Sequence, residues 1–179
     1  MRYCENPNTS HVTLEVASQP GKGRRLLWVD DSGPLLGLYK MVFENLGFQV
    51  EVTCSPHEAL DRMSSQDMDA AILDYEMPEM DGGILASLIK RRHPELPVIL
   101  YSGSILIPQN ARHWVDAICS KAAPREELLT IIETLAQRAE LRARNEEHLA
   151  QREAEDHETA MVFGREQSRQ RQEFLFSSR

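Results

Sequence analysis

The sequence predicts an α/β fold in which helices cover both faces of a parallel sheet. Between residues 24 and 138, five short apolar runs alternate with five segments whose apolar residues recur with helical spacing. Such alternation is typical of linked strand–helix units. The first run, 24–31, is a short apolar run on a basic start, as expected for a strand buried on both faces. The composition, with 41% hydrophobic and 27% charged residues, agrees with a soluble globular domain.

Each expected strand is a short apolar or alternating run that stops at a polar residue. The five strands are 24–31, 48–54, 69–74, 98–102 and 117–121. The first two helices begin at clear signals. Pro34 lies in a first turn, where its missing N–H costs nothing, and Ser55 and Glu58 have the spacing of a capping box.

Each helix is expected to bury one apolar face. The inward residues are expected to be Leu35, Leu38, Val42 and Leu46 in the first helix, Ile84, Leu85, Leu88 and Ile89 in the third, and Leu128, Leu129, Ile131, Ile132 and Leu135 in the last. Pro108 is expected to interrupt a short helix over 105–114.

Cys54 and Cys119 lie in apolar runs, so both thiols are expected to be buried. With Cys4 they are odd in number and form no CxxC pair, which argues against a disulfide framework or a zinc site.

Five polar side chains stand at the carboxyl ends of these strands. They are Asp30 and Asp31 on the first, Asp74 on the third, Ser102 on the fourth and Lys121 on the fifth. Parallel strands end at the same edge of a sheet, so these residues should converge. In a flavodoxin-like, doubly wound (βα)5 sheet of order 2-1-3-4-5, the ligand-binding switch point lies between the first and third strands.

The expected cluster has the chemistry of a phosphoryl site with a metal ion. Three crowded carboxylates repel each other unless a cation intervenes, and an all-oxygen ligand set suits Mg²⁺. Lys121 adds a second positive charge and Ser102 a hydrogen-bond donor. Such a site can receive a phosphoryl group on a carboxylate that acts as the nucleophile.

Over residues 24–138 the sequence resembles the receiver domain of two-component response regulators. The resemblance rests on the acidic pair Asp30-Asp31, Asp74 followed by Met77-Pro78-x-Met80-Asp81-Gly82, Ser102 after the fourth strand and Lys121 after the fifth. Each motif alone is common, since an acidic pair can cap a helix and a serine before glycine can serve a turn. All of them in order, each at a strand end, are specific.

The resemblance implies that Asp74 accepts a phosphoryl group from a sensor histidine kinase or a histidine phosphotransfer protein. Lys121 would then pair with the phosphoryl oxygens, and Ser102 would hydrogen-bond them. Such a domain is not an enzyme beyond its own phosphorylation and dephosphorylation. It signals by protein–protein interaction with an output protein that the sequence does not name.

The resemblance also implies the Mg²⁺ ligands. Asp31 would bind the ion directly and Asp30 largely through water. The carboxylate of Asp74 and the backbone carbonyl of Glu76 would complete the protein ligands.

The sequence departs from the family pattern near the fifth strand. Ile118 stands where the family usually has tyrosine or phenylalanine, so the aromatic switch is absent or altered. Ala122 and Ala123 separate Lys121 from Pro124, whereas the family usually has proline directly after the lysine. These departures leave open a receiver-like binding module that is not phosphorylated and acts constitutively. An aspartyl-phosphate hydrolase of the haloacid dehalogenase type is the other alternative, but the first strand lacks its DxD motif.

Three parts are expected along the chain: a flexible lead-in over 1–23, the receiver over 24–138, and a charged helical extension over 139–179. The extension should be helical to about residue 159, broken at Gly164 and disordered over 167–179. It has no DNA-binding motif, and the net charge of −8 gives no reason to expect nucleic acid. A stand-alone receiver is therefore expected, with a possible homodimer through the extension. No apolar segment resembles a signal peptide or a membrane span, so the expected location is the cytoplasm, with no membrane partner.

Overall fold

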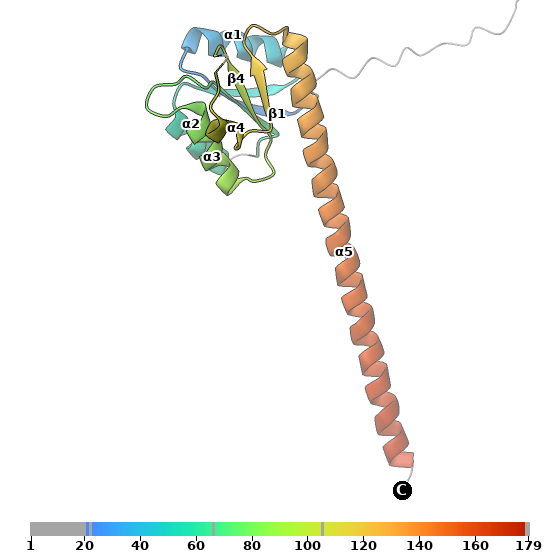
Figure 1. Ribbon diagram of the computed structural model, residues 1–179. Coiled ribbons are helices and arrows are strands. Elements are labelled where there is room, and N and C mark those ends of the chain that lie inside the picture. Colours follow the sequence, from blue (N-terminus) through green and yellow to red (C-terminus); the bar gives the residue numbers. More distant parts are fainter. Residues whose placement is uncertain (1–20, 22, 66, 105, 178–179) are drawn as a thin grey trace, which may run out of the picture. The chain divides into compact units, whose positions relative to one another are not determined.

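A computed structural model of the protein describes residues 21, 23–65, 67–104 and 106–177, with the backbone alone for 64, 65, 153, 155, 156 and 158–177. The lead-in expected over 1–23 therefore lies almost wholly outside the described residues. The chain divides into two compact units after Glu133. The first unit holds a five-stranded parallel sheet of order β2-β1-β3-β4-β5, which confirms the flavodoxin-like prediction (Figure 1).

Strands and helices alternate without exception along the first unit. The strands are β1 Arg25–Val29, β2 Gln49–Thr53, β3 Ala70–Leu73, β4 Val98–Ser102 and β5 Ala117–Ser120. The helices are α1 Gly33–Glu44, α2 Pro56–Ser65, α3 Gly82–Arg92, α4 Gln109–Arg112 and α5 Arg125–Ser177.

The sheet separates two hydrophobic layers, because successive side chains of a strand point to opposite faces. On one face, Leu27 and Leu100 join a buried cluster with residues of α2, α3 and α4. On the other face, the Trp28 ring stacks on Tyr39 of α1, with ring centroids 4.4 Å apart, and meets the edge of Phe43 at 5.0 Å. The three central strands, β1, β3 and β4, are almost fully buried, which is why their sequences are apolar on both faces.

The inner faces of two helices differ from the sequence prediction. In α1 the buried residues are Leu36 and Phe43, while Leu35 and Leu38 are 37% and 49% exposed. The inward face is therefore rotated by one position, because the aromatic side chains of this helix fill the space around Trp28. In α3, Ile84 is likewise exposed, whereas its neighbours Leu85 and Ile89 are buried as expected.

Three further predictions were wrong. Pro108 does not interrupt a helix but stands at the N-cap of α4, where its fixed φ is compatible with the helix start. The helix α5 continues through Gly164 to Ser177, since one glycine costs a helix only about 1 kcal/mol and good helix formers flank it. Cys54 is exposed, although Cys119 is buried as predicted. Among the described residues, none of the helices has the length and apolarity needed to cross a bilayer.

Candidate functional site

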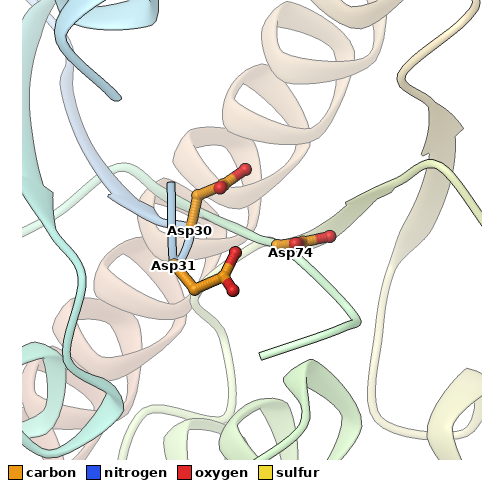
Figure 2. A group of neighbouring side chains, drawn as sticks. All are labelled: Asp30, Asp31 and Asp74. Atoms are coloured by element: carbon orange, nitrogen blue, oxygen red, sulfur yellow. The ribbon is translucent and has the colours of Figure 1, made fainter. Parts of the chain in front are cut away.

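Three carboxylates meet at the carboxyl edge of the sheet. Oxygen atoms of Asp30, Asp31 and Asp74 all lie within 4.8 Å of one another, and Figure 2 shows the three side chains side by side. Asp30 and Asp74 are 1% and 5% exposed, whereas Asp31 is exposed. Two of the three negative charges are therefore held away from bulk water.

The pairing of β1 with β3 brings these residues together. Val29 and Leu73 are partners in the parallel ladder, so the residues that follow them are neighbours. The ladder extends one step further, because the Asp74 amide donates to the Val29 carbonyl at 2.8 Å. Asp30 is fixed from the other side, since its Oδ1 accepts a hydrogen bond from the Ser32 amide at 2.9 Å. The local turn thus positions the Asp30 carboxylate, and the sheet positions Asp74.

Lys121 connects the two buried carboxylates. Its Nζ lies 2.7 Å from Oδ2 of Asp30 and 3.1 Å from Oδ2 of Asp74. Burial acts to lower the pKa of the Lys121 ammonium, but hydrogen bonds and charges from Asp30 and Asp74 outweigh it and raise the pKa above its usual value. The lysine is therefore charged at neutral pH and partly offsets the crowded carboxylates.

The environment of Asp74 disfavours its ionised form. Burial raises the pKa of its carboxyl above the usual value, and the negative charge of Asp30 acts in the same direction. The ammonium of Lys121 and the backbone N–H of Glu76 oppose this shift without cancelling it. Asp74 is thus a desolvated carboxylate with a cation and a backbone donor beside it, which is a suitable environment for a nucleophile.

The turn after Asp74 is held by very close packing. A Cβ on Gly82 would lie 2.1 Å from the Asp74 carbonyl oxygen and 2.8 Å from a methyl carbon of Leu100, so only glycine fits there. Asp81 caps α3, because its side chain accepts a hydrogen bond from the Ile84 amide at 2.8 Å. These two residues of the motif therefore serve the turn and the helix start.

The structure places Ser102 at the same edge, with its hydroxyl turned to its own loop. Ser102 is 2% exposed, and its Oγ accepts a hydrogen bond from the Ser104 amide at 3.0 Å. Its carbonyl accepts a hydrogen bond from the Lys121 amide at 2.9 Å, which ties the ends of β4 and β5 together. Ile118 is partly buried and packs against the core on the α2–α4 face.

Two features of the site were missed by sequence reasoning. The backbone N–H of Glu76 donates to Asp74, whereas only its carbonyl had been considered. The charges of the site also act on Tyr39 of α1. The pKa of its phenol is raised, mainly by burial. Tyr101, Asp30 and Asp74 also raise this pKa, whereas Lys121 lowers it. No sequence signal marks Tyr39, because its position follows from the rotation of α1.

A family model for the response regulator receiver domain matches residues 26–133, which is more than half of the chain. The chain belongs to the response regulator receiver family. Among curated proteins, this receiver is 35% identical over 79 residues to protein-glutamate methylesterase/protein-glutamine glutaminase 1 of Anaeromyxobacter dehalogenans, a match that covers 44% of this chain and 22% of that protein. It is 35% identical over 78 residues to the DNA-binding transcriptional regulator NtrC of Klebsiella pneumoniae, covering 43% of this chain and 17% of that protein.

Solved structures agree with the family. The response regulator protein TrrA of Thermotoga maritima, in complex with Mg²⁺-BeF, matches with a TM-score of 0.60 and 26% identity over 63% of this chain and 98% of that chain. A CheY-like receiver domain from Methanospirillum hungatei shares the fold, with a TM-score of 0.62 and 23% identity over 67% of this chain and 98% of that one. The receiver spans only about a fifth of the length of the two curated relatives, so their complete activities do not transfer to it.

Proposed function

We propose that this receiver accepts a phosphoryl group on Asp74 from the phosphohistidine of a sensor histidine kinase or a histidine phosphotransfer protein. The observation that carries the proposal is the cluster of three carboxylates at the carboxyl edge of the sheet, two of which contact Lys121. A buried carboxylate beside a fixed ammonium can attack an electrophilic phosphorus while the ammonium offsets the charge that develops.

Within this protein, the transfer would change the charge of Asp74 alone. A carboxylate oxygen of Asp74 would form a bond to phosphorus as the bond between phosphorus and the histidine nitrogen breaks. The electron pair of that bond would return to the imidazole of the partner. Lys121 would hold a phosphoryl oxygen, and Ser102 would donate its hydroxyl to another after turning from the Ser104 amide.

The donor set fits Mg²⁺. Carboxylate oxygens are hard ligands, and Mg²⁺ in proteins usually keeps several waters beside one or two carboxylates. Asp30, Asp31 and Asp74 supply such oxygens close together, and the exposure of Asp31 leaves that side open to water. We assign these three carboxylates and the backbone carbonyl of Glu76 as the protein ligands. When bound, the ion would offset the charge of the carboxylates and of the incoming phosphoryl oxygens.

We further propose that the protein acts in the cytoplasm and that the part of the chain that the structure describes signals through protein contacts and not by binding DNA. In support, the described backbone from residue 134 to 177 is a single helix, without the several short elements of a winged-helix domain. That helix is also the place where a homodimer could form. The receiver itself is assigned to residues 24–138, and its role is signalling, with no turnover of an external substrate.

The proposal is tested by measuring the intact mass of the protein after incubation with Mg²⁺ and acetyl phosphate. Wild type should gain one phosphoryl group, Asp74→Asn should gain none, and the exposed control Asp61→Asn should behave as wild type. Equal labelling of Asp74→Asn would place the acceptor elsewhere. If wild type gains no mass and also fails to bind beryllofluoride, the constitutive binding module becomes the better explanation.

A further inference from the structure

A second candidate site lies at the opposite edge of the sheet, where the strands begin. A cavity of about 320 Å³ is lined by Lys90, Pro94, His113, Trp114, Val115 and Asp116. We name these residues, together with Arg91, the basic–aromatic pocket. The Asp116 carboxylate accepts a hydrogen bond from the amide of Val98, the first residue of β4, at 2.8 Å. The five residues of β4, at about 3.3 Å each, separate this edge from the carboxylate cluster by roughly 15 Å.

The pocket combines an apolar wall with an excess of positive charge. Lys90 and Asp116 form an ion pair of 2.7 Å, so these two charges compensate each other. The guanidinium of Arg91, an exposed residue, lies 5.7 Å from the centre of the partly exposed Trp114 ring, and the His113 ring meets that ring edge-on at 5.1 Å. The stacked Arg91 therefore remains as a positive charge at the rim of an indole surface.

The segment that supplies the pocket is basic, in contrast to the chain as a whole. The complete chain has a net charge of −8, yet residues 86–116 carry Lys90 and three arginines against only Glu95 and Asp116. Basic residues in the last turn of α3 are favoured by the helix dipole, but that effect does not account for a partly exposed tryptophan ring beside Arg91.

We propose that the basic–aromatic pocket binds an acidic peptide segment of a partner protein. A carboxylate of the peptide pairs with Arg91, and an apolar side chain beside it packs on Trp114 and Pro94. The volume suits one or two side chains, and tryptophan and arginine are the residues that most often dominate the energy of protein interfaces. Complementary charge supplies the specificity and accelerates association.

A peptide fits the pocket better than a nucleic acid does. Lys90 and Asp116 compensate each other, so the excess charge at the pocket is the single guanidinium of Arg91, which suits one peptide carboxylate better than a run of phosphates. The proposal is independent of phosphorylation at Asp74, because the two sites are at opposite edges of the sheet.

The test uses the full chain with ¹⁵N-labelled tryptophan, since the protein has only two indoles. Trp28 is fully buried in the core and reports that the fold is intact, while Trp114 reports the pocket. The probe is the capped peptide Glu-Glu-Leu-Glu-Glu, compared with versions in which glutamine or lysine replaces glutamate. The acidic peptide should shift the Trp114 indole resonance and leave that of Trp28 in place. Binding should weaken with added salt.

Arg91→Gln should weaken peptide binding by about tenfold, because a charge-assisted contact is lost. The matched control Arg152→Gln makes the same change of charge on an exposed residue of α5 and should bind as wild type. The proposal is overturned if Trp114 does not respond to the acidic peptide, or responds equally to the glutamine peptide. It is equally overturned if Arg91→Gln binds as wild type, or if an oligothymidylate shifts Trp114 more strongly than the peptide. None of these results depends on acetyl phosphate or Mg²⁺, so failure here leaves the proposed phosphoacceptor function untouched.

Discussion

Replacing Lys121 with glutamine should destabilise the metal-free protein strongly, and Mg²⁺ should remove most of the difference. The ammonium contacts two buried carboxylates, at 2.7 Å from Asp30 and 3.1 Å from Asp74. Glutamine is similar in length but carries no charge. Lys121→Gln therefore leaves three neighbouring carboxylates without a compensating cation.

The expected size of the effect follows from these distances. With an effective dielectric constant near 20, the two attractions are about 6 and about 5 kcal/mol, and the desolvation of all three groups offsets most of this. Removing one member of a buried ion pair usually costs roughly 3–5 kcal/mol, because the remaining charge is uncompensated. Lys121 retains 22% exposure of its side chain, so we expect the lower end, a loss of about 3 kcal/mol in the free energy of unfolding.

Urea unfolding followed by Trp28 fluorescence, in a Trp114→Phe background, measures this loss for the receiver alone. The long helix α5 would dominate a far-UV circular dichroism signal, whereas Trp28 lies in the core of the sheet. In EDTA the variant should lose about 3 kcal/mol, and in excess Mg²⁺ about 1 kcal/mol. By linkage, the recovered 2 kcal/mol corresponds to about thirtyfold tighter Mg²⁺ binding by the variant.

The pH dependence gives an internal check. The pKa of Lys121 is raised above its ordinary value of 10.5, so its contribution to stability is complete below that pH. It is lost only as the pH rises through the raised pKa, and the difference between wild type and variant should be constant from pH 7 to pH 9. Arg144→Gln, which breaks an exposed pair with Glu140, should change stability by less than about 0.5 kcal/mol. Equal stability of Lys121→Gln and wild type in EDTA, or a difference that Mg²⁺ does not reduce, would refute the reasoning.

Three further predictions concern other parts of the receiver. Gly82→Ala should lower the free energy of unfolding by about 3 kcal/mol in the same urea experiment, because the new Cβ meets the Asp74 carbonyl. The control Gly37→Ala should not destabilise the protein, because a Cβ there has no other atom within 4 Å. Iodoacetamide should alkylate the exposed Cys54 and spare Cys119, because burial and Glu127 raise the pKa of the Cys119 thiol. Peptide mapping that finds Cys119 modified in the folded protein would contradict this. Hydrogen bonds from Thr53 and Arg62 lower the pKa of Glu58 below its ordinary 4.5, so Glu58→Gln should lower the melting temperature above that pH. The effect should vanish as the pH falls through the lowered pKa, and a difference that persists in acid would contradict it.

The fold could be predicted from sequence because its signals are local and mutually consistent. Apolar runs of strand length end at polar residues, and Pro34 and the Ser55 cap mark where helices begin. The parallel arrangement then brings the strand ends together without any knowledge of side-chain packing. That is why Asp30 and Asp74, separated in sequence, could be expected at one edge before their contacts with Lys121 were known.

The details that failed depend on packing that the sequence does not reveal. The helical spacing of apolar residues does not show whether Leu35 or Leu36 faces the core. Only Leu36 is buried, because the aromatic residues of α1 orient the helix around Trp28. Gly164 was taken as a break, but the sequence on both sides continues the helix. The orientation of the Ser102 hydroxyl toward Ser104 is likewise a matter of loop geometry, which strand patterns do not determine.

The charge balance of the site suggests how Lys121 would act both before and after phosphorylation of Asp74. Three carboxylates and one ammonium leave a net charge of −2 at neutral pH, which a single divalent cation would neutralise. Phosphorylation of Asp74 would replace a carboxylate of charge −1 with a phosphoryl group of up to −2 and would move that charge outward from the sheet. Lys121 should then be drawn from its contact with Asp30 toward the phosphoryl oxygens. Its backbone amide is bonded to the Ser102 carbonyl, so this shift would reach the end of β4 directly, although the chain has Ile118 in place of an aromatic switch.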